Sequence, residues 1–350
     1  MKRISFVRCS NRLKCKDAMI KNISCIFIGI ILLVSCHDDD KKPNIKIPEL
    51  DKKYIEMSGC LGLYDAVTFN VGTSAYIGLG WVNVIGDNLH FYKYTPKYRE
   101  WVWMEQPFPG KHRIHAVTFA IGGKAYVGLG RSKLGSTTVY EAYDDFFVYD
   151  TLTREWEELQ FKFPGKPRWG AVAFVIEGKA YVGTGFDGSI PPYNGDYFAD
   201  FYELDPQKGW KQISDIYYPR YGAIAFVANN LGYVCFGGLY SSTSKQNVQV
   251  YDPVAARWKE LPVQYEEEET RELSEGVNVK SFVLTKDGEE FVYVFGDSGS
   301  WGYVPRENIW KSLGDPMGGY LGFAAENKGF LVNTVKERFE AYEFTFRDER

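Results

Sequence analysis

Three arginines are the side chains of this chain best suited to binding chemistry. Arg113, Arg168 and Arg220 hold equivalent positions in three successive motifs, RIHA, RWGA and RYGA. A guanidinium group presents a planar fork of N–H donors that matches a carboxylate or a phosphate bidentately. We therefore expect the three arginines to gather at one end of the fold and to hold an acidic ligand.

Aromatic side chains accompany these arginines and could stack on the flat faces of a sugar. The expected ligand-binding set contains, besides the three arginines, Trp169, Tyr221, Tyr193, Tyr240 and Trp301. A structural interpretation stands beside this one, in which the arginines stack on Trp169 or Tyr221 and donate to loop carbonyls. Because 17% of the chain is aromatic, many of these rings must pack in the core. The sequence leaves both interpretations open.

The elements that position these residues repeat about every fifty residues, a period typical of closed arrays of small sheets. Each copy has an apolar strand, a tight turn with glycine, and a return strand of the form Tyr-x-Gly-x-Gly. Phenylalanine holds one place in the repeat and tyrosine another: Phe69, Phe119, Phe174 and Phe226, then Tyr76, Tyr126, Tyr181 and Tyr233. Each copy closes with a Tyr or Leu and, several residues later, a Trp.

Two weaker copies begin at Val279 and Tyr320, which brings the expected number of sheets to six. The last copy ends before its fourth strand, whereas residues 53–58 precede the first copy and have the composition of a strand. We expect this N-terminal strand to complete the last sheet, because closure removes exposed strand edges. The predicted fold is therefore an all-β, six-bladed propeller closed by an N-terminal strand.

From about residue 52 to residue 350 the chain resembles the six-bladed Kelch-type β-propellers, and especially Kelch-repeat lipoproteins described as galactose-oxidase-like. The double glycine of the Kelch pattern survives as Gly237-Gly238 and is elsewhere a Gly-x-Gly. Kelch domains of ubiquitin-ligase adaptors resemble the chain at the start of the inner strands, where they use arginines to grip acidic peptides. The resemblance implies this role for the three arginines, while Leu63, Asn278 and Tyr320 replace arginine in the other blades.

The copper chemistry of galactose oxidase does not fit this sequence. A radical copper site needs two histidines and two tyrosines, one of them linked to a cysteine. From residue 36 onward the only histidines are His37, His90, His112 and His115, and their placement does not suit such a site. We expect no cofactor and no bound metal.

The N-terminus carries a second signal. An apolar run from Cys25 to Ser35 is too short to span a bilayer and ends in Leu-Val-Ser-Cys, which resembles the lipobox of bacterial lipoproteins. The predicted segments are a signal peptide over 1–35, with Met19 as an alternative start, lipidated Cys36 with a polar tether over 36–51, and the propeller over 52–350. This predicts an outer-membrane lipoprotein displayed at the cell surface.

The net charge and the cysteine content limit the partners and the cross-links that the chain is expected to form. The formal net charge of −4 argues against nucleic acid. Four of the six cysteines lie in the leader or at the lipid site, so Cys60 and Cys235 are expected to be free thiols. No heptad pattern suggests self-association, and we expect a monomer.

Three functions remain open. The first is a non-catalytic binding module for a glycan or an acidic ligand. The second is a sugar mutarotase, because sialic-acid mutarotases are Kelch-like propellers of similar size and need an acid, a base and a grip on the carboxylate. The third is a scaffold for a protein partner at the cell surface. The sequence nominates no general base, so binding ranks first.

Overall fold

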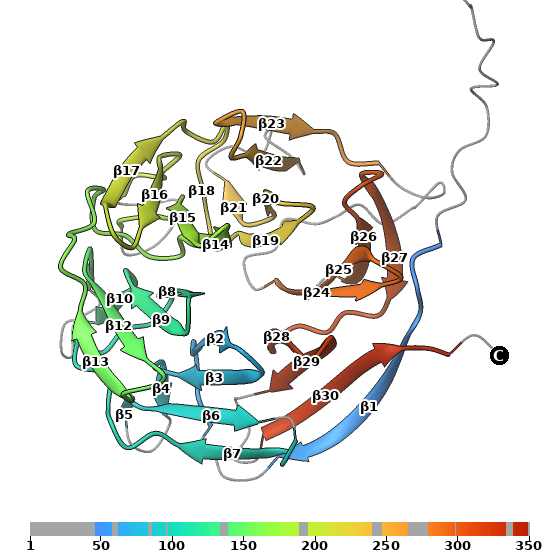
Figure 1. The fold of residues 1–350 in the computed structure, drawn as a ribbon, viewed down its shortest axis with the longest axis horizontal. Helices are drawn as coiled ribbons and strands as arrows, with labels where there is room; N and C mark the ends of the chain where they lie inside the picture. Colours follow the sequence, from blue (N-terminus) through green and yellow to red (C-terminus); the bar gives the residue numbers. More distant parts are fainter. Residues whose placement is uncertain are drawn as a thin grey trace, which may run out of the picture. The chain divides into compact units, whose positions relative to one another are not determined.

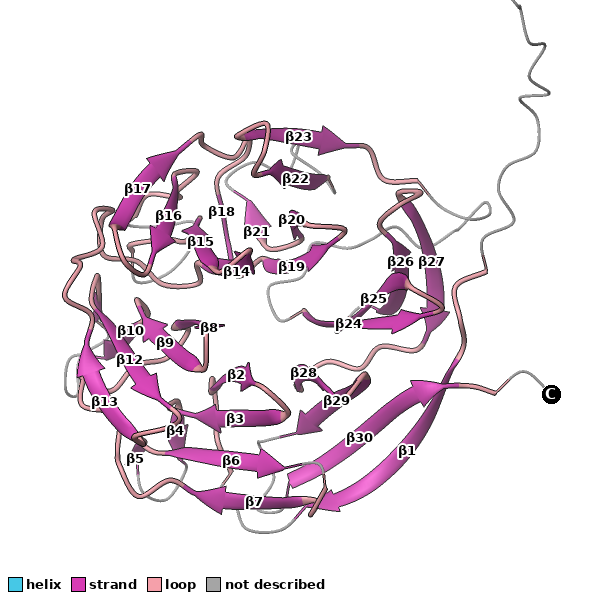
Figure 2. Cartoon of the chain, viewed as in Figure 1, coloured by secondary structure: helices cyan, strands magenta, loops and turns pink. Residues whose placement is uncertain are grey.

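The computed structural model describes residues 46–57, 62–82, 86–95, 97–133, 139–188, 195–239, 247–264, 279–297, 299–333 and 339–348. Tyr193, Tyr240, Cys36 and Cys60, which the sequence singled out, lie outside these residues. Every element in the described part of the chain is a β-strand (Figure 2). No helix in the same part is long and apolar enough to cross a bilayer.

Six antiparallel sheets of four strands, the blades, surround a common centre (Figure 1). The first blade contains β2 (Val67–Val71), β3 (Ser74–Gly78), β6 (Phe91–Thr95) and β7 (Glu100–Trp103). The second contains β8 (Val117–Ile121), β9 (Lys124–Gly128), β12 (Phe146–Asp150) and β13 (Glu155–Glu158). The third contains β14 (Val172–Ile176), β15 (Lys179–Gly183), β16 (Phe201–Asp205) and β17 (Gly209–Ile213).

The remaining three blades repeat this arrangement. The fourth contains β19 (Ile224–Ala228), β20 (Leu231–Cys235), β22 (Val248–Asp252) and β23 (Arg257–Leu261). The fifth contains β24 (Lys280–Lys286), β25 (Glu289–Gly296), β26 (Gly299–Val304) and β27 (Ile309–Gly314). The sixth contains β28 (Leu321–Ala325), β29 (Lys328–Asn333), β30 (Phe339–Phe346) and β1 (Leu50–Met57).

Three two-stranded sheets accompany the blades. They pair β4 (Trp81–Val82) with β5 (Gly86–Asp87), β10 (Arg131–Lys133) with β11 (Tyr140–Ala142), and β18 (Arg220–Tyr221) with β21 (Gly238–Leu239). The inner strands of the blades form a closed ring, because each contacts its two neighbours in the order β2, β8, β14, β19, β24, β28 and back to β2. Blades three places apart in this ring therefore face each other across the centre.

The N-terminal strand completes the sixth blade, as predicted. β1 pairs antiparallel with β30 from Leu50 opposite Phe346 to Met57 opposite Phe339. The propeller begins earlier than expected, however, since Ile47 is buried and Pro48 accepts a hydrogen bond from the Tyr293 hydroxyl at 2.8 Å. Residues 46–51 therefore belong to the propeller and not to the predicted tether.

Aromatic pairs hold each blade together and seal it to its neighbour. Across one hairpin, Phe119 stacks on Tyr126 with ring centroids 4.9 Å apart. At the outer edge of the same blade, Trp156 packs on Tyr149 at 5.1 Å and on Phe91 of the preceding blade at 5.6 Å. Offset and edge-to-face pairs of this kind add about 0.5–1.5 kcal/mol beyond the area that they bury. The Tyr-to-Trp spacing in the sequence therefore marks the contact between neighbouring blades.

Cys235 lies in β20 and is a free, buried thiol, as predicted. Burial raises the pKa of the thiol, so the nucleophilic thiolate is disfavoured. Cys235 is therefore a packing residue of the fourth blade.

Candidate functional site at the mouth of the central channel

Equivalent residues of five blades lie at one end of the channel. Each stands four residues before the phenylalanine that pairs with an aromatic residue of the next strand, such as Phe69 opposite Tyr76. In blade order these mouth residues are Asp65, His115, Gly170, Gly222 and Gly319. In the fifth blade the corresponding pair is Phe282 opposite Tyr293, so the mouth position is residue 278, which lies outside the described residues. The five described positions combine an acid and an imidazole with three glycines.

The backbone explains why these residue types occur here. Asp65, His115, Gly170 and Gly222 all have positive φ, between 52° and 63°. Glycine adopts this region without a steric cost, and aspartate and histidine are enriched among the other residues found there. The Gly170 N–H donates to the His115 carbonyl at 3.1 Å, and the Gly222 N–H donates to the Gly170 carbonyl at 2.7 Å. These bonds fix the spacing of the mouth residues in neighbouring blades.

Lys280 enters the cavity from a different position. It is the first residue of β24 and pairs with Phe295, so it corresponds to Val67 and Val172, the first residues of β2 and β14. The additional residues of β24 lie at its hairpin end. The extended backbone at Lys280 carries a long side chain without strain.

The mouth residues line a cavity of about 350 Å³. Its polar side chains include Asp65, His115 and Lys280, and Tyr64 and Tyr320 lie at the same level. The other walls are formed by small residues of the inner strands and their leads, which include Thr68, Thr118, Ala171 and Ala223. A concave site with a few convergent polar groups is the usual form of a small-molecule site.

Burial tunes the charges around this cavity. Desolvation lowers the pKa of His115 to about 4, with Arg131 and Lys280 acting in the same direction and Asp65 opposing them. His115 is therefore neutral at pH 7 and can exchange a proton as an imidazole. Desolvation also lowers the pKa of Lys280, again opposed by Asp65. Clustered groups with shifted pKa values are a physical indication of a functional site.

A cation held between aromatic rings borders the mouth. The Arg131 guanidinium lies 3.6 Å from the centroid of the Trp169 ring and 4.3 Å from that of Tyr140. Trp169 also packs beside His115 at 5.2 Å and beside Tyr221 at 5.3 Å. The structure thus places the predicted residues Trp169 and Tyr221 next to the mouth, although Trp169 is only 4% exposed.

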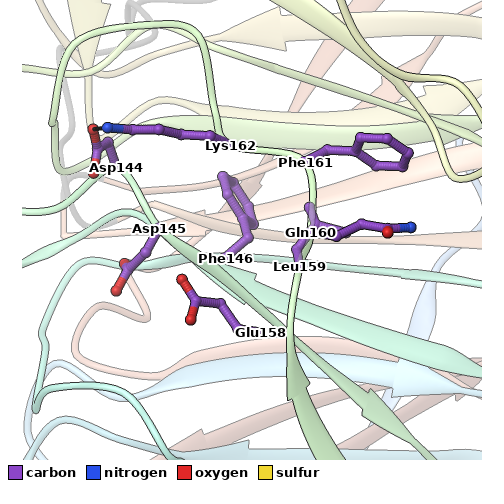
Figure 3. Close-up of a pocket in the computed structure, with 8 residues that line it drawn as sticks. All are labelled: Asp144, Asp145, Phe146, Glu158, Leu159, Gln160, Phe161 and Lys162. Atoms are coloured by element: carbon purple, nitrogen blue, oxygen red, sulfur yellow. Dashed lines mark ion pairs between the residues drawn. The ribbon is translucent and has the colours of Figure 1, made fainter.

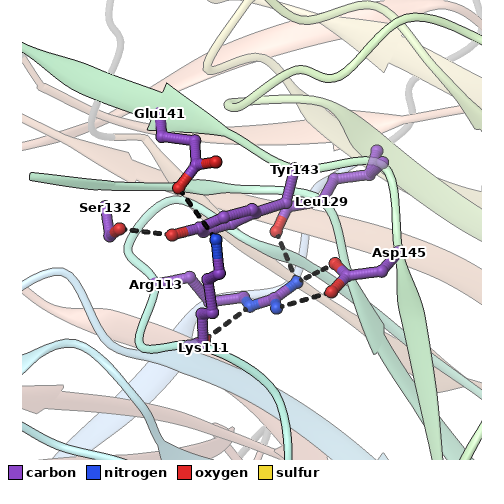
Figure 4. Close-up of polar contacts among 7 residues, drawn as sticks. All are labelled: Lys111, Arg113, Leu129, Ser132, Glu141, Tyr143 and Asp145. Carbon is purple, nitrogen blue, oxygen red and sulfur yellow. Dashed lines mark hydrogen bonds and ion pairs between the residues drawn. The ribbon is translucent and has the colours of Figure 1, made fainter. Parts of the chain in front are cut away.

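The three predicted arginines lie elsewhere. Arg113 is fully buried, and its guanidinium donates to both oxygens of Asp145 at 2.6 and 3.1 Å (Figure 4). The same group donates to the Leu129 and Lys111 carbonyls, each at 3.1 Å, and lies 4.7 Å from the Tyr143 ring. These contacts tie the lead of the inner strand to the loop before β12.

The other two arginines repeat this arrangement. Arg168 forms a bidentate pair with Asp200, and Arg220 donates to the Asn247 amide oxygen at 2.7 Å. Because Arg220 is desolvated beside a neutral amide, its pKa falls to about 10. These donors serve the protein's own loops, which differs from the expectation that they face a ligand.

Two further expectations differ from the structure. Trp301, which was expected in a loop, lies within β26 and is 3% exposed. In the sixth blade the register of β28 with β29 pairs Phe323 with Phe330. With this register, Met317 corresponds to the arginines of the second, third and fourth blades. Tyr320, which the sequence analysis had aligned with those arginines, lines the mouth cavity instead.

A second hollow, of about 490 Å³, lies where β12 begins and β13 ends (Figure 3). Its charged groups are largely satisfied, since Lys162 pairs with Asp144 at 3.4 Å and Asp145 holds Arg113. Within the described residues, no group of three or more His, Cys, Asp or Glu side chains is arranged to hold a metal ion. The channel mouth is therefore the better candidate site.

Sequence reasoning missed Asp65 and Lys280 and considered His115 only as a copper ligand. The signal was present in the repeat, because the third residue of RWGA and RYGA is glycine and the same place in RIHA is histidine. Lys280 was overlooked because it stands where the other inner strands begin with an apolar residue, such as Val117 or Val172.

The buried arginine pairs predict a large stability effect. Replacing Arg168 with alanine leaves the Asp200 carboxylate without its cation, so the free energy of unfolding should fall by about 3–5 kcal/mol. Adding Asp200→Asn should recover part of that loss. Urea unfolding of the two single variants and the double variant measures the coupling. Unchanged stability in Arg168→Ala would contradict a structural role.

His115 predicts a pH-dependent stability. Its pKa is about 4 in the folded chain and about 6.5 when unfolded, so between these values the unfolded state binds more protons. The stability that follows from this pKa difference is fully present above pH 6.5 and is lost as the pH falls toward 4. The free energy of unfolding should decrease over this range by an amount on the order of 2 kcal/mol. His115→Asn suits the positive φ and should lack this component. Unfolding curves of both proteins from pH 7 to pH 4 test the difference, and parallel curves would contradict it.

Comparison with known proteins agrees with this architecture. The family model described as the KLHDC2/KLHL20/DRC7 Kelch-repeats domain matches residues 66–297, which is more than half of the chain. No curated protein matches the chain. Among solved structures, that of YjhT is similar, with a TM-score of 0.61 and 15% identity over 84% of this chain and 99% of that chain. This likeness concerns the fold alone. On the family match and its six blades, the chain belongs to the Kelch-repeat β-propellers.

Proposed function

We propose that the propeller is a binding module whose channel mouth holds a small acidic ligand of the sugar class. The observation that carries this proposal is the convergence of Lys280, Asp65 and His115 on a cavity with otherwise small walls. A Kelch propeller is a scaffold, so its activity must reside in such a locally built site.

The charges at the mouth favour an anion. Lys280 and the nearby Arg131 are cationic, Asp65 is the one carboxylate among the described residues that line the cavity, and His115 is neutral at pH 7. The Arg131 side chain is held in place by Trp169 and Tyr140 and loses little freedom when a carboxylate binds. Asp65 can accept hydrogen bonds from the hydroxyl groups of the same ligand. The sequence predicted that Arg113, Arg168 and Arg220 hold an acidic ligand; the proposed site assigns this role to Lys280 and Arg131 instead.

Anomer exchange of a sugar is a second candidate. It is favoured by the neutral imidazole of His115, whose electrostatic environment includes the Asp65 carboxylate. Ring opening needs a proton to move from the anomeric hydroxyl while another reaches the ring oxygen. Among the described residues of the cavity, Asp65 and His115 are well placed by their chemistry to exchange these protons.

Binding measurements test the first candidate. The acidic sugars N-acetylneuraminate and glucuronate should bind the propeller at low salt, and the neutral sugar galactose should bind more weakly. Lys280→Met keeps the apolar stem and removes the charge, so affinity for the acidic sugars should fall by about tenfold or more, which corresponds to about 1.4 kcal/mol. Lys286→Met, at the other end of β24, is the matched control. Titration calorimetry gives both affinities.

An unchanged affinity in Lys280→Met, or no binding of any sugar, would overturn the proposed site and leave a protein partner as the favoured ligand. Anomer exchange is followed on the same proteins by NMR. Rates equal to those in buffer, or an acceleration that persists in His115→Asn, would remove the second candidate.

We also propose that the chain is an outer-membrane lipoprotein anchored through Cys36 and displayed at the cell surface. The Leu-Val-Ser-Cys motif and the acidic residues that follow it support this proposal. In a Gram-negative host, the protein should incorporate labelled palmitate, and Cys36→Ala should abolish the label. Protease added to intact cells should remove the propeller if it faces outward. Label in the variant, or protection from protease until the cells are lysed, would contradict the anchor or the orientation respectively.

A further inference from the structure

Lys280 and His115 face each other across the mouth cavity. They belong to the fifth and second blades, which lie three places apart in the closed ring of inner strands (Figure 1). Asp65 stands in the first blade, beside His115, and both side chains line the cavity together with Lys280. A molecule in this cavity would thus meet an amine from one side and two proton-exchanging groups from the other.

The surroundings of Lys280 suit a nucleophile. Lys280 lines the cavity, and the Asp65 carboxylate of the same cavity acts electrostatically on its amine. Burial lowers its pKa, so a larger share of the amine is neutral near pH 7 than for an exposed lysine. A neutral lysine amine in a desolvated pocket is the usual attacking group in Schiff-base chemistry.

We propose that Lys280 forms a reversible imine with the open-chain aldehyde or ketone of a small hydroxylated ligand. This inference rests on the proposed ligand site, since it uses the same cavity. It adds a covalent step and a substrate class, that of small hydroxy-carbonyl compounds, which includes reducing sugars.

The step balances without an oxidant or a reductant. The lone pair of Nζ attacks the carbonyl carbon, and the C=O electron pair moves to the oxygen, which takes up a proton. The nitrogen gives up one proton to form the neutral carbinolamine. A second proton then converts the hydroxyl group into water, which leaves as the nitrogen lone pair forms the C=N bond. The products are one protonated imine and one water, and the imine becomes neutral when its nitrogen gives up the remaining proton.

The remaining cavity residues fit these requirements. His115 and Asp65 supply positions at which protons can be taken up and released. The adjacent mouth residues Gly170 and Gly222 have no side chain, which leaves room for a ligand between Lys280 and His115. Hydroxyl groups of the ligand would lie near the backbone that these glycines expose.

Reductive trapping tests the proposal. The propeller is incubated at pH 7 with low millimolar glyceraldehyde and cyanoborohydride, which reduces an imine to a stable secondary amine. Peptide mapping should find Lys280 modified about tenfold faster than the exposed Lys111, because burial lowers the pKa of Lys280 whereas the hydrogen bond to Glu141 raises that of Lys111. Modification spread evenly over surface lysines, or an unmodified Lys280, would overturn the proposal.

Variants separate chemistry from folding. Lys280→Arg should lose the modification at this site, while Lys286→Arg should leave labelling of Lys280 unchanged. His115→Asn should slow the labelling while the melting temperature at pH 7 stays close to that of the parent. An equal labelling rate in His115→Asn would remove His115 from the proton transfers. Mapping of the modified lysines in the parent protein does not require that any variant folds.

The two proposals fail in different ways. A methyl glycoside of an acidic sugar cannot open to a carbonyl, so it reports non-covalent binding alone. If the glycoside binds and Lys280 is not trapped by glyceraldehyde, the imine is excluded and the binding site stands. If Lys280 is trapped but acidic glycosides do not bind, the preference for acidic ligands is excluded and the reactive lysine stands.

Discussion

The antiparallel pairing of β1 with β30 is the interaction on which the rest of the structure depends. It brings residues from both ends of the propeller into one blade and leaves the ring of inner strands closed. Without it, β30 would be an exposed edge, and the sixth blade would lack its outer layer. Only a closed ring brings Asp65 of the first blade and Lys280 of the fifth to the same cavity.

Within this ring, the buried arginines fix the leads of the second, third and fourth inner strands. Each guanidinium joins its lead to the loop before the third strand of its own blade. In the first blade Leu63 and His90 occupy the two places, so the cation and its partner are replaced together. This follows from the cost of burying a charge without a partner. The arginines therefore support the site by holding its backbone.

Much of the fold could be predicted because the aromatic residues that join the blades recur at constant spacing. The start of the propeller could not be placed, since one buried residue, Ile47, decides it and a single apolar residue forms no pattern. The role of the arginines was ambiguous for a similar reason. Asp145 and Asp200 follow their arginines by the same interval of 32 residues, which is a readable signal, but nothing in a sequence shows that the partners meet. Lys280 was missed because it occupies the first inner-strand position, where the other blades carry valine, isoleucine or leucine.

The left-handed backbone at the mouth limits how this protein family can diversify. Where the mouth residue has positive φ, as at Asp65, His115 and Gly170, the set of tolerated amino acids narrows to glycine and a few short polar residues. A long side chain enters the cavity instead from the first residue of an inner strand, where the backbone is extended, as at Lys280. New specificities would therefore evolve at the first inner-strand positions as well as at the mouth. A designer who wishes to place a second amine in this channel would begin with Val67, Val117 or Val172, because their backbone accepts a lysine and a single codon change per site is enough.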